Sequence, residues 1–120
     1  GPATELAFTA HEILADTAGA MNISQLHALG VGDLNGDGLL DIITGKRYYA
    51  HPGDMDPGGL DPAILSWFEL GRDGGASFTQ HPIHMDSGVG CVFSVTDVDG
   101  NGKPDIFISN KKGTFLHRQR

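Results

Sequence analysis

Residues 33–41 have the sequence Asp-Leu-Asn-Gly-Asp-Gly-Leu-Leu-Asp, and residues 97–105 repeat the pattern as Asp-Val-Asp-Gly-Asn-Gly-Lys-Pro-Asp. Each stretch places oxygen-bearing side chains at loop positions 1, 3, 5 and 9, with glycine at positions 4 and 6. Ca²⁺ is a hard cation that takes about six to eight oxygen ligands, and a short loop supplies them by curling around the ion. Glycine permits the positive φ angles that such a curl requires. The spacing therefore predicts two calcium loops.

The expected ligands are side-chain oxygens at the four polar positions and the backbone carbonyl at position 7, with position 9 closing the cage. The first predicted site consists of Asp33, Asn35, Asp37, Asp41 and the Leu39 carbonyl. The second consists of Asp97, Asp99, Asn101, Asp105 and the Lys103 carbonyl.

Two alternatives compete with this interpretation. An EF-hand loop ends in a bidentate Glu at position 12 and lies between helices, whereas position 12 here is Thr44 or Ile108. The flanking residues 29–31, 42–44, 92–95 and 106–108 are rich in β-branched and aromatic side chains, which favours strands. The second alternative, a hairpin turn without metal, needs only one or two Asp, Asn or Gly residues. Two complete copies favour the metal loop.

Composition narrows the class of protein. Eighteen glycines and six prolines lie between short apolar runs, which favours an all-β chain. No apolar run approaches the ~18 residues of a membrane span. The net charge of −7 argues against a nucleic-acid partner. Cys91 is the single cysteine, so it has no partner for a disulfide within the chain, and the apolar residues after it predict a buried strand position.

The chain divides into eight expected strands and no convincing helix, at residues 6–14, 29–31, 41–46, 64–70, 77–84, 92–95, 105–109 and 114–119. Internal repetition supports this division, because Phe8-Thr9 and its following turn recur seventy residues later at Phe78-Thr79, just as the calcium loops recur. Gly1-Pro2 resembles the remnant of a protease site used to remove purification tags and is set aside from the fold.

The runs at 33–45 and 97–109 resemble FG-GAP/VCBS repeats, the blades of integrin-α-like calcium-binding β-propellers, and the resemblance extends over residues 6–120 when the flanking strands are included. It implies four antiparallel strands per blade, with the calcium loop between strands one and two, and the same two ligand sets. The expected fold is therefore all-β, with two four-stranded propeller blades in a module over residues 3–120. The first calcium blade spans about 26–85 and the second about 91–120. The integrin Phe-Gly-Gly-Ala-Pro signature is absent.

In blade order, the chain begins with an outer fourth strand at residues 6–14, and the second calcium blade lacks its own fourth strand. Propellers close with roughly four to eight blades. The expected partners are therefore other propeller blades, either in a homo-oligomer or in a longer parent chain. Calcium modules of this kind suit a secreted, periplasmic or cell-surface location, because extracellular calcium modules bind the ion at about 10⁻⁴–10⁻³ M.

A long polar connection after the first loop is the candidate ligand face, because long loops on rigid scaffolds often carry binding. Its candidate residues are Lys46, Arg47, Tyr48, Tyr49 and His51, with Lys111 and Lys112 of the second repeat expected nearby. Such groups suit a glycan or a protein ligand, and the face is expected to meet residues 86–88. The sequence offers no catalytic residue set, so a binding scaffold is favoured. The alternative is a propeller enzyme acting on carbohydrates, with residues 46–61 contributing to its site.

Overall fold

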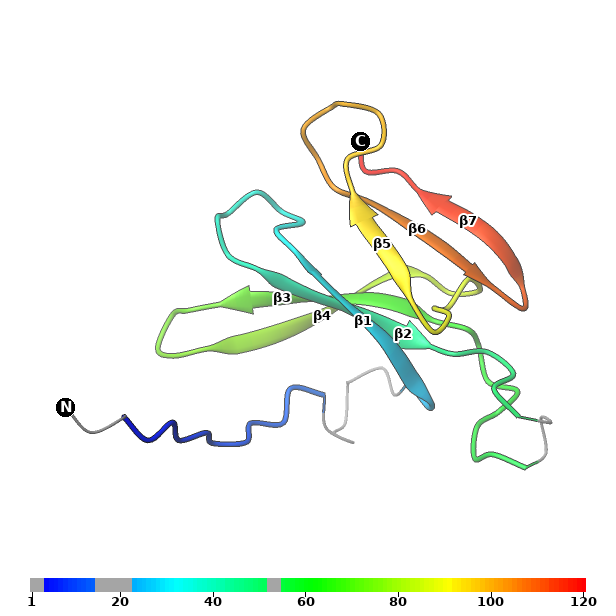
Figure 1. The fold of residues 1–120 in the computed structure, drawn as a ribbon, viewed down its shortest axis with the longest axis horizontal. Helices are drawn as coiled ribbons and strands as arrows, with labels where there is room; N and C mark the ends of the chain where they lie inside the picture. The colour runs from blue at the N-terminus through cyan, green and yellow to red at the C-terminus, as the bar shows by residue number, and fades with distance from the viewer. Residues whose placement is uncertain (1–3, 15–22, 52–54) are drawn as a thin grey trace.

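The computed structural model describes residues 4–14, 23–51 and 55–120, and the described residues form seven β-strands in two antiparallel sheets (Figure 1). The first sheet has the order β1 (Leu26–Gly32), β2 (Asp41–Lys46), β3 (Leu65–Gly71) and β4 (Ser77–His84). The second has the order β5 (Phe93–Thr96), β6 (Asp105–Asn110) and β7 (Gly113–His117). The all-β class is confirmed. Among the described residues there is no helix that could span a membrane.

The two predicted calcium loops are the first hairpin connections of the two sheets. Gly32 pairs with Asp41 at the base of one loop, and Thr96 pairs with Asp105 at the base of the other. In each hairpin, the last residue of the strand before the loop thus pairs with the first residue of the strand after it. Both loops lie at the same side of the molecule (Figure 1). This arrangement excludes the helix-flanked EF-hand.

The core lies between the two sheets, where β1 packs against β5. Ile43 and Leu65 of the first sheet meet Ile106 and Ile108 of the second, and all four are buried. The backbones of β1 and β5 approach closely because Gly30 has no side chain: a Cβ there would lie 2.7 Å from a ring carbon of Phe93. The strand that leads into the first loop therefore packs directly against the strand that leads into the second.

The connection from β4 to β5 is bonded to the segment that follows β2. Val89 donates its N–H to the Lys46 carbonyl at 2.8 Å, and Gly88 donates to the Ala63 carbonyl at 2.6 Å. Gly88 has φ +59°, and a Cβ at this position would lie 2.4 Å from the Lys46 carbonyl oxygen. Residues 86–89 are thereby placed beside the candidate ligand face, as expected from the sequence.

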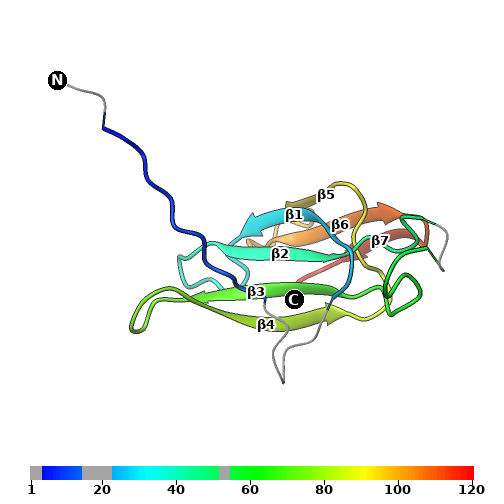
Figure 2. The same cartoon turned by 90° about the horizontal axis from the view of Figure 1, so that it is seen from below.

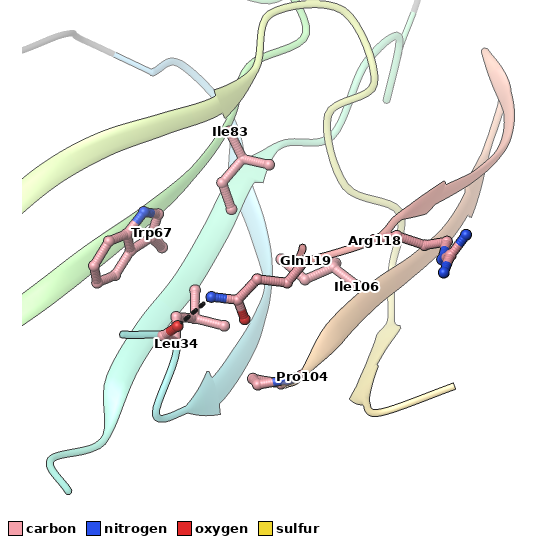
Figure 3. Close-up of a pocket in the computed structure, with 7 residues that line it drawn as sticks. All are labelled: Leu34, Trp67, Ile83, Pro104, Ile106, Arg118 and Gln119. Atoms are coloured by element: carbon pink, nitrogen blue, oxygen red, sulfur yellow. Dashed lines mark hydrogen bonds between the residues drawn. The ribbon is translucent and has the colours of Figure 1, made fainter. Parts of the chain in front are cut away.

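A hollow of about 250 Å³ separates the sheets near the C-terminus, between Trp67 and Ile83 on one side and Ile106 and Gln119 on the other (Figure 3). The Gln119 carboxamide donates Nε2–H to the Leu34 carbonyl and so ties the C-terminal segment to the first loop. Its Oε1 atom is buried without a hydrogen-bond partner. The hollow lies beside β7, which is an edge strand because nothing in the described chain pairs with its outer side.

Two sequence-based predictions are wrong. Residues 6–14 form no strand: they run as an extended segment, with Leu6 79% and Phe8 91% exposed (Figures 1 and 2). A strand requires a neighbour for its backbone groups, and this segment has none in the described chain. The second sheet has three strands, as expected for a blade that lacks its own fourth strand. Cys91 is exposed in the bend before β5 rather than buried in a strand. The Gly1-Pro2 prediction lies outside the described residues.

Candidate functional site

The first loop is curled by its own side chains. Asp33 Oδ1 accepts hydrogen bonds from the N–H groups of Gly36 (2.7 Å) and Asp37 (3.1 Å), and Oδ2 accepts one from Gly38 (2.8 Å). Gly36 and Gly38 have φ angles of +77° and +85°, which a residue with a side chain adopts only with strain. The predicted role of the two glycines is therefore confirmed.

The next two polar positions continue the same curl. Asn35 Oδ1 accepts from the Asp37 N–H at 3.1 Å, and Asp37 Oδ1 accepts from the Leu39 N–H at 2.8 Å. Each oxygen thus bonds the backbone two residues onward, as Asx turns do. Residues 35–38 at the tip of the loop are solvent-exposed, whereas Leu34 and Asp41 are buried.

The second loop repeats this pattern bond for bond. Asp97 accepts from Gly100 (2.8 Å), Asn101 (3.2 Å) and Gly102 (2.7 Å), with the same division between its two oxygens. Asp99 accepts from the Asn101 N–H, and Asn101 Oδ1 accepts from the Lys103 N–H at 2.8 Å. The two sequence copies therefore specify one geometry.

The aspartate at position 9 has a role that the sequence pattern did not reveal. Asp41 is fully buried, and its Oδ2 accepts from the Leu34 N–H at 2.9 Å while its Oδ1 accepts from the Leu70 N–H at 3.0 Å. Leu70 lies in β3, so this carboxylate joins the loop to the third strand of the sheet. Asp105 does the same between Val98 (2.9 Å) and Gln119 (2.8 Å).

Charged neighbours distinguish the two loops. Glu69, the residue before Leu70, accepts from Asn35 Nδ2 at 2.9 Å and lies 2.8 Å from His81 Nε2. At the equivalent position before Gln119, Arg118 makes an ion pair with Asp99. The hydrogen bonds from Arg118 lower the pKa of Asp99, and the same contact raises the pKa of Arg118. The first loop is therefore flanked by a carboxylate and the second by a cation.

The donor set of both loops fits a hard cation, because every polar side chain at the four predicted positions offers a carboxylate or amide oxygen. In the second loop, ligand oxygens of Asp97, Asp99 and Asp105 all lie within 4.8 Å of one another. In the first loop, position 3 is Asn35, so the set there consists of three carboxylates and one amide. Asp33 Oδ2 and Asp97 Oδ2 each accept one N–H and therefore keep a second lone pair for a further partner, whereas the Oδ1 atom of each accepts two N–H groups.

Comparison with known families agrees with this geometry. The FG-GAP repeat family model matches residues 26–58. This stretch is therefore similar to an FG-GAP repeat. The match includes β1, the first loop, β2 and the following connection, whereas the second loop lies outside it and is assigned from its sequence pattern and geometry. Searches of curated proteins and of solved structures gave no match.

The candidate ligand face begins within the FG-GAP repeat, and one predicted member does not belong to it. Lys46 is 1% exposed, and its Nζ donates to Ser24 Oγ at 3.1 Å and to the Gly58 carbonyl. Burial lowers the pKa of Lys46, and the nearby Asp61 carboxylate opposes that shift. Both faces of β2 are covered at this end of the strand, so Lys46 bonds the Ser24–Gly58 connection instead of facing solvent.

The remaining predicted residues lie at the surface. Tyr48 is partly buried, and Lys112 lies 4.3 Å above its ring while pairing with Asp86 at 2.6 Å. Tyr49 is 41% exposed, and Lys111 donates to its carbonyl at 2.8 Å. The structure therefore brings Tyr48 close to Asp86 and brings both tyrosines into contact with the second repeat, through Lys111 and Lys112.

His51 and Arg47 complete the face. His51 Nδ1 lies 2.6 Å from Asp56 Oδ2 in an exposed pair, and Arg47 Nη1 lies 3.5 Å from His27 Nε2. Because a guanidinium can only donate, His27 Nε2 is the acceptor in that contact. Residues 52–54 of this connection lie outside the described part of the chain.

Sequence reasoning missed Glu69, His81 and Arg118, which surround the loops. The signal was present in the alignment of the two repeats, because Glu69 and Arg118 occupy the same position before the residue that bonds the loop aspartate. Recognising it required the register of the third strands, which the sequence alone leaves open.

Proposed function

We propose that this chain is a calcium-binding β-propeller repeat module that serves as a structural scaffold for a ligand or a protein. The observation that carries the proposal is the repeated set of hydrogen bonds in the two loops, each formed by oxygen side chains on glycine turns. Random Asp- and Gly-rich turns share composition, but they do not share six equivalent donor and acceptor positions. The FG-GAP repeat at residues 26–58 supports the propeller assignment.

Each loop gathers three carboxylates, which repel one another at neutral pH. A bound Ca²⁺ would supply the positive charge that offsets this repulsion. Asp33, Asn35 and Asp37 would hold it in the first loop with Asp41 and the Leu39 carbonyl, and the equivalent positions 97, 99, 101, 103 and 105 would hold it in the second. The chain's own contribution is to keep these oxygens gathered and to connect them, through Asp41 and Asp105, to the third strands.

The proposed partners are further blades, supplied by other copies of the chain or by a longer parent chain. β7 has an unpaired outer edge, and such an edge is a template for another strand. The hollow between Ile83 and Gln119 lies beside that edge, where a fourth strand would pack. A secreted, periplasmic or cell-surface location is part of the proposal, because calcium loops with modest affinity are filled at extracellular calcium concentrations.

Thermal unfolding with and without calcium tests the calcium role. Binding to the folded state alone stabilises by RT ln(1 + [L]/Kd), about 2.7 kcal/mol per site at a hundredfold excess over Kd. We therefore expect the melting temperature to rise by roughly 10 °C between excess chelator and excess Ca²⁺ at constant ionic strength. Mg²⁺ at the same concentration is the control for charge screening. Equal melting temperatures in calcium and chelator would refute the proposal.

A further inference from the structure

A second hollow, of about 400 Å³, lies on the face opposite the calcium loops, where the two sheets meet. Three segments line it: Arg47 and Tyr48 after β2, Cys91 and Val92 before β5, and Asn110 and Lys111 at the turn between β6 and β7. These segments come together because the end of β2, the start of β5 and the end of β6 lie on the same side of the molecule (Figure 1). The hollow therefore depends on both repeats and belongs to neither alone.

The charge of this hollow is positive, in a protein whose net charge is −7. Arg47 and Lys111 line it, and none of the other described lining residues is a carboxylate. Arg47 contacts the neutral acceptor atom of His27, and Lys111 donates to the neutral carbonyl of Tyr49. Among the described residues, neither makes an ion pair with a carboxylate. Two cations that share a hollow repel each other, and an anion between them would remove that repulsion.

Lys112, the next residue after Lys111, differs from it because its charge has a carboxylate partner. Lys112 also contacts a tyrosine, but it pairs with Asp86 at 2.6 Å, and this hydrogen bond raises the pKa of Lys112. Its charge is compensated within the protein. Among the described residues around Tyr48, the cations without a carboxylate partner are thus Arg47 and Lys111.

The remaining lining combines an aromatic ring with polar and apolar groups. Tyr48 offers a ring and a hydroxyl group, and the exposed Cys91 and the 78% exposed Val92 form the rim. The hollow lies at strand ends and turns. Peptide ligands most often pair with a sheet edge or enter a helix groove, and neither lines this site. Ring faces together with cations are suited to sugar rings that carry negative groups.

We propose that the hollow between Arg47 and Lys111 binds an acidic oligosaccharide through a carboxylate or sulfate group. Arg47 would bind the anionic group with its guanidinium fork, Lys111 would add a second cation, and Tyr48 would pack against a sugar ring. The proposal rests on the scaffold role proposed above and names its ligand class. It does not rest on calcium chemistry, because the hollow and the loops lie on opposite faces.

Cys91 supplies a direct readout, because the single cysteine of the chain lies in the rim of the hollow. Alkylation of Cys91 by iodoacetamide, a neutral reagent, is measured by mass spectrometry at fixed excess Ca²⁺. Three oligosaccharides of similar length are compared: a sulfated one (a heparin fragment), one bearing only carboxylates (an oligogalacturonate) and a neutral one (a maltohexaose). We expect one or both acidic sugars to slow alkylation at least several-fold and the neutral sugar to leave it unchanged, because a bound ligand covers the thiol.

Variants assign the effect to the hollow. Arg47→Gln and Lys111→Gln should each weaken binding of the acidic sugar roughly tenfold, since each removes a charge-assisted contact. Arg72→Gln changes the net charge equally in an exposed turn at the calcium side and should leave binding unchanged. The calcium-dependent melting shift is measured for each variant. An intact shift without protection of Cys91 by either acidic sugar overturns this proposal and leaves the calcium proposal standing.

Three other results would also overturn the proposal. The first is equal protection by the neutral sugar, and the second is equal affinity in Arg47→Gln, Lys111→Gln and Arg72→Gln. The third is stronger protection by an acidic peptide, such as oligoglutamate, than by either acidic sugar.

Discussion

The two sheets of this protein contain the same loop in different surroundings. In both loops the position-1 aspartate curls the backbone, and the buried position-9 aspartate ties the loop to the third strand. In the first sheet Glu69 adds a carboxylate beside the loop, whereas in the second Arg118 binds the position-3 carboxylate. The first sheet also has a fourth strand, β4, whereas the second ends at its third strand, β7. The two loops thus have the same geometry in different surroundings. Their affinities for a cation should differ, because the neighbouring charges differ.

Replacing the buried position-9 aspartate, which both loops share, should have the largest effect on stability. Asp41→Ala and Asp105→Ala each leave two backbone N–H groups without their carboxylate, and we expect a loss of roughly 3–5 kcal/mol of unfolding free energy in either sheet. The loss should persist in chelator, because the hydrogen bonds do not require the ion. Asn35→Ala removes one neutral oxygen from an exposed position and should cost far less. Chemical denaturation with and without calcium measures all three.

A result in which Asn35→Ala abolishes calcium binding while Asp41→Ala leaves it intact would show that the two positions have been assigned the wrong roles. Equal stability of Asp41→Ala and the parent protein in chelator would show that the buried carboxylate does not support the sheet by itself.

The open edge of the second sheet should have the next largest effect. Residues 4–14 expose Leu6 and Phe8 and resemble the segment that forms β4, so we expect this segment of one copy to pair with β7 of another. The contact is head-to-tail and can close into a ring. Light scattering over a range of concentrations should show oligomers, and removal of residues 1–14 should give a monomer. A full-length chain that stays monomeric at all concentrations would contradict this.

Replacing the charged neighbours that differ between the loops, Arg118 and Glu69, should have the smallest effect, and that effect should be on calcium affinity. Arg118→Gln should tighten calcium binding at the second loop roughly five- to tenfold, because Asp99 is then free of its competing cation. Glu69→Gln should weaken calcium binding at the first loop by a similar factor. Arg72→Gln controls for the change in net charge of Arg118→Gln, and Asp73→Asn, in the same exposed turn, controls for that of Glu69→Gln. Calorimetric titration resolves the two sites. If neither substitution changes the affinities, the loops act independently of their surroundings.

The sequence by itself determined the loops and most strand positions. Every donor and acceptor that curls a loop lies within the same nine residues, so local spacing was sufficient, and the glycines at positions 36, 38, 100 and 102 show the positive φ angles that this spacing requires. The alternating apolar residues around the loops likewise located β2, β4 and β6 within a residue of their observed bounds.

The tertiary structure alone decided which side chains meet between segments. Lys46 is buried because β2 carries buried residues on both faces, and Cys91 is exposed because the chain bends before β5. Residues 6–14 remain unpaired for a related reason: a β-strand forms only when the edge of another strand is available to pair with it. Glu69 and Arg118 reach their loops through strand register, a property of paired chains that no single stretch of sequence contains.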